Sequence, residues 1–147
     1  MSPADEIVIP ALLRAARGAY GNAIRAELAA AAFDDMPRNG PFVLGGMANR
    51  GIPAAVLTRQ LGVSKQAASQ LIDTLVLRGY LERRTNADDR RRIDIVLTDR
   101  GRAAAQIVRS AVESVDDALA ERLSPGEMSG LVAGLVALTV IREEAEG

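Results

Sequence analysis

The chain has 147 residues, a formal net charge of −1, 48% hydrophobic residues and 25% charged residues, a balance typical of a folded globular protein. It contains neither cysteine nor histidine. Disulfides, thiol redox switches and cysteine zinc sites are therefore excluded, and the commonest general base and transition-metal ligand are absent. No apolar run reaches the roughly 20 residues of a membrane span, and no secretory signal pattern opens the sequence, so we expect a cytoplasmic protein without membrane contact.

The first predicted helix covers about residues 9–33. Apolar side chains recur along it at helical spacing: Leu12, Leu13, Ala16, Ala19, Tyr20, Ala23, Ile24 and Leu28. Residues 34–41 are rich in Pro, Gly and Asn and are predicted as a loop. A short helix follows over residues 42–49. Two adjacent glycines inside it indicate either tight packing, which we favour, or a hinge or the wall of a ligand pocket.

Two helices joined by a tight turn are predicted over residues 57–61 and 65–78. Gly62 ends the first helix because glycine takes a positive φ without strain, and Ser64 is placed to cap the second. This spacing is typical of a helix-turn-helix. The second helix carries, opposite its apolar side, polar residues able to meet base edges and phosphates: Lys65, Gln66, Ser69, Gln70 and Asp73. An ordinary solvated helix face would show the same pattern.

A β-hairpin is predicted next, with strands over residues 80–84 and 93–97. The second strand has the alternating pattern of a half-buried strand, and the polar connection contains residues that favour turns. Residues 83–92 hold five Arg and two Asp. Guanidinium groups at a hairpin tip suit the electronegative minor groove of DNA, although a solvated charged loop is the alternative.

Two long helices are predicted to complete the chain. Thr98 can cap the first, over residues 99–122, and Ser124 with Glu127 forms a capping box for the second, which continues to about residue 144. The last helix is apolar on more than one face. We therefore expect another subunit to cover it.

The charges are unevenly distributed along the chain. Residues 50–102 carry 11 Arg or Lys and 6 Asp or Glu, a net +5, whereas residues 1–49 carry −1 and residues 103–147 carry −5. A basic middle between acidic flanks is the distribution expected when one face of a small domain binds DNA. Because 17 of the 18 basic residues are Arg, a general preference for Arg explains part of this excess, but not its clustering.

Several motifs in residues 54–101 occur together at the spacing of one family. They are LGVS at 61–64, GYLER at 79–83, a D-x-R wing motif on Asp89 and Arg91, and L-T-x-x-G ending at Gly101. This segment resembles the winged helix of the MarR family of bacterial transcription regulators. The resemblance implies a mainly α fold with a small β wing, in which one MarR-like domain spans residues 1–147. It would comprise a winged helix-turn-helix over about 41–101 and dimerisation helices over about 9–33 and 99–145.

The resemblance also implies a function and a DNA-binding site. The protein would be a homodimeric, sequence-specific repressor of transcription on a pseudo-palindromic double-stranded operator. Arg91 would enter the minor groove with Asp89 holding its side chain. The residues that would face the major groove are Ser64, Gln66, Ala67, Ser69 and Gln70; among them, Ala67 and Gln70 depart from the hydroxyl residue and the Arg often found there. Phosphate contacts are expected from Lys65, Arg83, Arg90, Arg91 and Arg92.

By the same resemblance, a small aromatic or phenolic effector would release the protein from DNA. It would bind between the dimer helices and the winged domain. The predicted lining residues are Arg14, Arg17, Tyr20, Asn39 and Phe42. We expect no metal and no cofactor.

Two other classes of function are considered. A winged helix can bind protein rather than DNA, but such a module has little need for three consecutive arginines at residues 90–92. An enzyme is not expected, because Asp88 and Asp89 are only sequence neighbours on a loop, no phosphate-binding glycine loop is present, and nothing assembles a nucleophile with a base.

Overall fold

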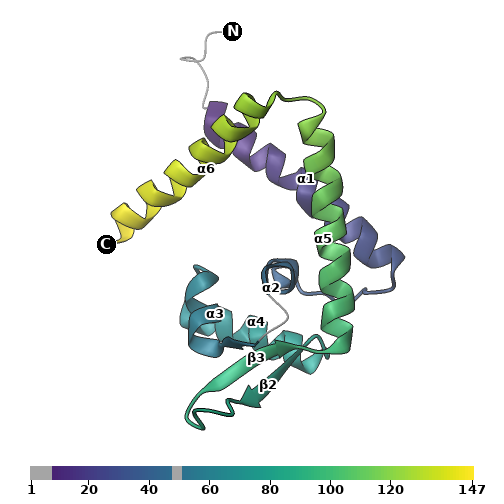
Figure 1. The fold of residues 1–147 in the computed structure, drawn as a ribbon, viewed down its shortest axis with the longest axis vertical. Coiled ribbons are helices and arrows are strands. Elements are labelled where there is room, and N and C mark those ends of the chain that lie inside the picture. Colours follow the sequence, from purple (N-terminus) through teal and green to yellow (C-terminus); the bar gives the residue numbers. More distant parts are fainter. Residues whose placement is uncertain (1–7, 48–50) are drawn as a thin grey trace. The chain divides into compact units, whose positions relative to one another are not determined.

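The structure, a computed structural model, describes residues 8–47 and 51–147. The chain divides into two compact units, residues 1–112 and residues 113–147. The fold is mainly α with a small antiparallel sheet, as predicted. Its elements, in chain order (Figure 1), are α1 (Val8–Ala30), α2 (Gly40–Gly46), β1 (Ile52–Pro53), α3 (Ala54–Gln60), α4 (Lys65–Leu77), β2 (Leu81–Thr85), β3 (Ile93–Leu97), α5 (Asp99–Ala120) and α6 (Pro125–Glu146).

Helix α1 ends three residues earlier than the sequence predicted. Ala32 adopts a left-handed backbone with φ +62°, and the amide of Phe33 donates to the carbonyl of Leu28 at 2.9 Å. This reversal satisfies a carbonyl at the helix end and stops the helix. The predicted end of the next helix, Asn49, lies outside the described residues; α2 begins at Gly40, two residues before the predicted start.

The sheet has a third strand that the sequence analysis missed. The order is β1-β3-β2, with both pairings antiparallel. The predicted hairpin is present, with Leu81 opposite Leu97, and Ile52 of β1 pairs with Ile95 on the other side of β3. A strand of two residues is too short to show an alternating pattern, so only the pairing identifies it.

The hydrophobic core of the first unit lies between the helices and the sheet. Its largest fully buried side chains are Tyr80, Leu44, Leu75, Leu81, Ile95 and Val43. Leu28 of α1 and Val108 of α5 belong to the same cluster. The winged segment therefore shares one core with the end of α1 and the start of α5, which fixes the hairpin and α4 in place.

The second unit consists of the end of α5 followed by α6. The predicted capping box is present: the amide of Glu127 donates to Oγ of Ser124 at 3.2 Å, and the amide of Ser124 donates to Oε1 of Glu127 at 3.0 Å. These hydrogen bonds lower the pKa of the Glu127 carboxyl. No residue of α6 is buried within this chain. Its exposed large apolar side chains are Leu131, Val132, Leu135, Val136, Leu138, Val140 and Ile141.

None of the helices in residues 8–47 and 51–147 is long and apolar enough to cross a lipid bilayer.

Candidate nucleic-acid interface

Helices α3 and α4 form the predicted helix-turn-helix. Gly62, in the turn, has φ +64°, a backbone that a side chain would strain. Oγ of Ser64 accepts a hydrogen bond from the amide of Ala67 at 3.1 Å and so caps α4. The buried side of α4, formed by Ala68, Ile72 and Leu75, holds the helix against the core.

The opposite side of α4 is open to solvent. All six predicted DNA-contacting residues of this element are exposed: Ser64, Lys65, Gln66, Ala67, Ser69 and Gln70. Oγ of Ser64 already accepts the capping hydrogen bond. Its hydroxyl hydrogen remains available to donate a hydrogen bond to DNA. The recognition face, as we call these six residues, is therefore a solvent-exposed polar surface on one rigid helix.

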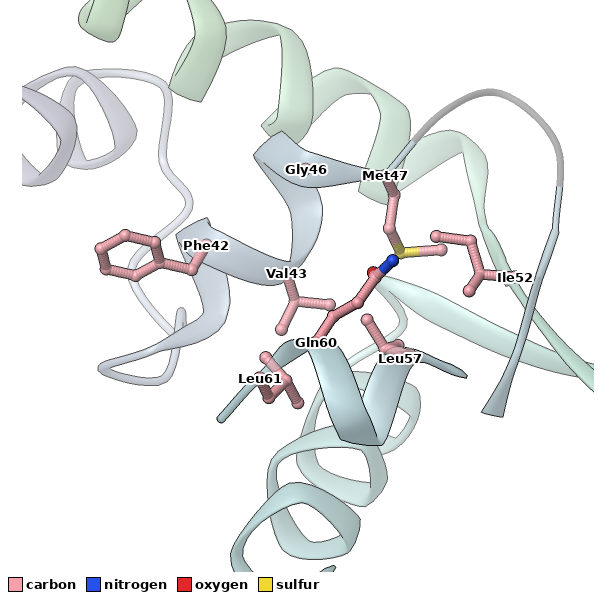
Figure 2. A pocket seen from close by; sticks show the side chains of 8 residues that line it. All are labelled: Phe42, Val43, Gly46, Met47, Ile52, Leu57, Gln60 and Leu61. Carbon is pink, nitrogen blue, oxygen red and sulfur yellow. The ribbon is translucent and has the colours of Figure 1, made fainter. Parts of the chain in front are cut away.

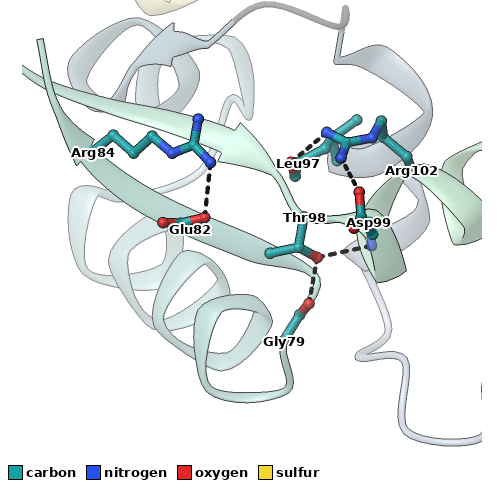
Figure 3. A network of polar contacts seen from close by, with 8 residues as sticks. Gly79, Glu82, Arg84, Leu97, Thr98, Asp99 and Arg102 are labelled. Carbon is teal, nitrogen blue, oxygen red and sulfur yellow. Dashed lines mark hydrogen bonds and ion pairs between the residues drawn. The ribbon is translucent and has the colours of Figure 1, made fainter. Parts of the chain in front are cut away.

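Arg83 of the wing is joined to this helix by an ion pair. Its guanidinium contacts the carboxylate of Asp73 on α4, and both side chains remain partly exposed. Asp73 lies seven residues after Gln66 and therefore on the same side of α4. The sequence placed Asp73 on this face but did not predict its partner. On the same strand, Arg84 pairs with Glu82 at 3.2 Å (Figure 3).

Asn86 organises the turn at the tip of the hairpin. Its Oδ1 accepts hydrogen bonds from the amides of Asp88 and Asp89, both at 2.9 Å, and its Nδ2 donates to Asp94 at 2.8 Å. The amide of Arg92 donates to the carbonyl of Asp89 at 3.0 Å. An asparagine that holds two following amides is a common way to close a turn. The sequence analysis did not assign Asn86 this role.

The predicted relation between Asp89 and Arg91 takes a different form in the structure. Oδ1 of Asp89 accepts from the backbone amide of Arg91 at 3.0 Å, and no ion pair joins their side chains within the described residues. The carboxylate is two residues away and reaches the amide more readily than the guanidinium. Asp89 therefore fixes the turn that presents Arg91 in the structure without DNA.

Arg90, Arg91 and Arg92 are all exposed at the tip. Arg92 pairs with Asp94 at 3.2 Å. Across the described ranges of the chain, no ion pair involves Arg90 or Arg91. Neither guanidinium is therefore held in an ion pair within those ranges.

The L-T-x-x-G motif is the joint between the wing and α5. Thr98 Oγ1 donates to the carbonyl of Gly79 and accepts from the amide of Gly101 at 3.0 Å (Figure 3). Gly79 itself has φ +82° and ends α4. Arg102 donates to the carbonyl of Leu97 at 3.0 Å. One threonine thus links the end of the recognition helix to the first turn of α5.

A polar and aromatic cluster at the base of the wing was not predicted. The hydroxyl of Tyr80 donates to the carboxylate of Asp35, and Arg100 donates to Asp35 at 2.7 Å and to the Tyr80 hydroxyl at 3.0 Å. The Arg100 guanidinium also lies 4.6 Å from the Tyr80 ring centroid and 5.5 Å from that of Phe33. Because these residues come from distant parts of the sequence, no local sequence pattern predicts the cluster.

The pKa values of the three titratable groups in this cluster depend on one another. The hydrogen bond from Tyr80 lowers the pKa of Asp35, with a further contribution from Arg100. Burial raises the pKa of Tyr80, because the phenolate would lose hydration. The hydrogen bond to Tyr80 raises the pKa of Arg100. The loop before α2 is thereby tied to the wing by a charged hydrogen-bond network.

The five residues predicted to line an effector site lie on α1, just before α2 and on α2. Arg14 and Arg17 are exposed on α1, Tyr20 is half-buried there, and Asn39 precedes α2. Phe42 alone of the five lines the pocket described below. Within the described residues, no group of three or more Asp and Glu side chains is arranged to hold a metal ion.

Residues 35–92 match the sequence model of the MarR family, which covers α2, the helix-turn-helix and the wing tip. Over these residues the chain is similar to the MarR family. The matched residues include the whole recognition face and every wing arginine considered above. The exposed face of α4 and the arginine tip thus both lie in the part of the chain that is similar to this family.

Solved structures share this fold along nearly the whole chain. RV1404 of Mycobacterium tuberculosis is 26% identical, with 97% of this chain and 96% of that chain covered, at a TM-score of 0.65. MepR of S. aureus, solved as a complex with DNA, is 20% identical over 92% of this chain and 98% of that chain, at a TM-score of 0.73. FabT of Streptococcus pneumoniae, also in complex with DNA, is 18% identical over 92% and 97%, at a TM-score of 0.71.

A curated relative matches only part of the chain. The Mycobacterium tuberculosis protein named "Uncharacterized protein Rv2011c" is 29% identical over 82 residues, which are 56% of this chain. The match spans 57% of the length of that relative.

Proposed function

We propose that the protein is a sequence-specific repressor of transcription that binds double-stranded DNA as a homodimer and is released by a small molecule. The observation that carries DNA binding is the joint exposure of the recognition face and the arginine tip. The major groove of DNA admits an α-helix, and arginines favour the narrow, electronegative minor groove. Helix and tip belong to one unit with one core, so they can act together.

The distribution of charge supports the same proposal. The recognition face contains Lys65 and no acidic residue, and Arg90 and Arg91 lack acidic partners within the described part of the chain. Neutralising phosphates with such groups releases counterions, which makes DNA affinity depend steeply on salt. Asp73, the acidic residue nearest the face, is compensated by Arg83.

The apolar surface of α6 supports the homodimer. Seven large apolar side chains of this helix are exposed, and a single chain gains nothing from leaving such a surface in water. A second copy is the occupant we propose, because a twofold dimer would present two recognition helices about 34 Å apart, one turn of DNA. An operator with two inverted half-sites follows from that symmetry.

The family and its solved members support the proposal as well. MepR and FabT, which share the fold at TM-scores of 0.73 and 0.71, were both solved with DNA. The resemblance to regulators released by aromatic or phenolic compounds is the support for an effector.

The test is fluorescence anisotropy of the purified protein with its own promoter and with a scrambled duplex, across a salt series. We expect tight binding to the promoter only. Arg91→Ala should weaken that binding about tenfold and reduce the salt slope by about one. Arg122→Ala, an exposed arginine of the second unit, is the matched control and should change neither quantity.

Equal, weak binding to both duplexes at every salt concentration would contradict the proposal at that promoter. Unchanged promoter binding by Arg91→Ala would instead contradict the role given to the wing. A protein-binding winged helix, the alternative function, would tolerate Arg91→Ala and bind neither duplex.

A further inference from the structure

A pocket lies between α2, β1 and α3, and of the five residues predicted to line an effector site only Phe42 lines it. Its volume is about 290 Å³. The lining residues (Figure 2) are Phe42, Val43, Gly46, Met47, Ile52, Leu57, Gln60 and Leu61. We name it the α2–α3 pocket. It lies wholly within the first unit.

The side chains that line the α2–α3 pocket are mostly apolar. Among the residues that the structure describes, no charged residue lines it, and the amide of Gln60 is the one polar side chain there. Figure 2 shows this amide extending toward Met47, with Val43, Leu57 and Ile52 around it. An ion placed here would lose its hydration without gaining a counter-charge. An uncharged molecule with one hydroxyl or carbonyl group matches the amide, which both donates and accepts.

The size of the pocket limits the molecule further. An apolar cavity of about 150 Å³ holds one benzene. A volume of about 290 Å³ therefore suits a molecule of one or two rings.

The position of the pocket connects it to DNA recognition. Leu57 and Leu61 line it from α3, and Gly62 and Ser64 follow directly as the turn and the cap of α4. A molecule held against α3 contacts the helix that supports the recognition helix. Such a molecule changes DNA affinity if it binds the free protein and the DNA-bound protein with unequal affinity.

We propose that the α2–α3 pocket binds a small, uncharged, mostly apolar molecule with one hydrogen-bonding group, and that this site holds the effector. The second part rests on the proposed function, whereas binding itself does not. The proposal differs from the expectation drawn from sequence, because the arginines of α1 take no part and an anionic ligand is disfavoured.

The probes are 2-naphthol, naphthalene and 2-naphthoate, which share two rings and differ in their polar group. Binding of each to the full chain without DNA is measured by calorimetry and, for 2-naphthol, by its own fluorescence, since the chain has no Trp. We expect 2-naphthol to bind most tightly. Naphthalene should bind about 2- to 10-fold more weakly for want of one hydrogen bond, and 2-naphthoate more than about tenfold more weakly.

Gly46, which lines the pocket, provides the variant that adds a side chain at the pocket wall. A Cβ atom on Gly46 meets no atom within 4 Å, so Gly46→Phe can enter the open space without a backbone clash. It should weaken 2-naphthol binding by at least about tenfold, whereas the control Gly46→Ala leaves the space open and should not. Gln60→Leu should remove the preference for 2-naphthol over naphthalene. Circular dichroism checks that each variant is folded.

Failure of all three probes to bind, or 2-naphthol binding that Gly46→Phe leaves unchanged, overturns the proposed site. Binding of 2-naphthoate as tightly as 2-naphthol overturns the proposed ligand class. Promoter binding measured with and without saturating 2-naphthol tests the regulatory part separately. If the protein binds its promoter but 2-naphthol does not alter the affinity, the effector role fails while the proposed DNA-binding function stands; if it binds no promoter, that function fails while the ligand site stands.

Discussion

The carbonyl oxygen of Tyr80 occupies the place where a side chain at Gly101 would begin. A Cβ atom on Gly101 would lie 1.9 Å from that oxygen, so only glycine allows the first turn of α5 to sit against the start of the wing. The same turn is capped by Thr98, which also holds Gly79 at the end of α4. The motif glycine is thus required by packing at the wing base.

Gly101→Ala should therefore destabilise the fold strongly. Moving the Tyr80 carbonyl or α5 to make room should cost about 2 to 4 kcal/mol. Urea unfolding followed by circular dichroism measures the loss. Gly46→Ala is the control, since its new Cβ has open space and should change the free energy of unfolding by less than about 1 kcal/mol. Equal stability of the two variants would refute the packing explanation.

Stability in acid should depend on Asp35. Its pKa is lowered in the folded state by the Tyr80 hydroxyl, so its stabilising contribution is complete above the unfolded pKa of about 3.9 and is lost as the pH falls through the folded value. Asp35→Asn should flatten the fall in unfolding free energy below about pH 4. Urea unfolding over a pH series tests this, with Asp34→Asn as the neighbouring control. A slope unchanged from that of the control would rule out this role.

The shape of the wing tip should depend on Asn86. Asn86→Ala removes the acceptor of two turn amides and a donor to Asp94, which should loosen the tip with little loss of global stability. We expect faster hydrogen exchange at residues 88 and 89 and promoter affinity about 3- to 10-fold lower. Asn22→Ala, a surface asparagine of α1, is the control. Normal exchange at the tip would show that Asn86 is dispensable.

The Asp73–Arg83 ion pair should restrain non-specific DNA binding more than it stabilises the fold. Both side chains are partly exposed, so their coupling in unfolding should be about 0–1 kcal/mol. Asp73→Asn removes a negative charge beside the recognition face and frees Arg83 for phosphate. Affinity for a scrambled duplex should rise about threefold. A double-mutant cycle with Arg83→Gln separates the two effects, and reduced affinity of Asp73→Asn would contradict this view.

The apolar surface of α6 should control assembly. Val132 and Val136 are adjacent on the helix and more than half exposed. Replacing both by Lys would place two charges in the proposed dimer interface and should produce monomers in sedimentation velocity. Gln106→Lys, at an exposed polar position of α5, should leave the assembly unchanged. A doubly substituted protein that still sediments as the wild type would exclude this surface from the interface.

Local chemistry explains why the sequence predicted the helix-turn-helix and the hairpin. Gly62, Ser64 and Gly79 act on neighbouring amides and carbonyls, so their effects can be read within a few residues. The alternating apolar residues of β3 likewise record one buried face. The resemblance added the MarR family, and the family match over residues 35–92 confirmed that resemblance for this part of the chain.

Tertiary structure alone decided the features that join distant residues. Asp35 and Tyr80 are 45 residues apart, and Asp35 and Arg100 are 65 apart, so no sequence pattern records their contact. Strand β1 forms because Ile52 pairs with Ile95 of β3. The α2–α3 pocket forms because α2, β1 and α3, which are separate elements, leave space between them. The sequence by itself determined which residues of α4 and the wing face water, because the periodicity of a helix or a hairpin sets which side chains point to the same side. Tertiary packing decided which buried residues support these exposed ones, because contacts between distant segments depend on how the whole core is assembled.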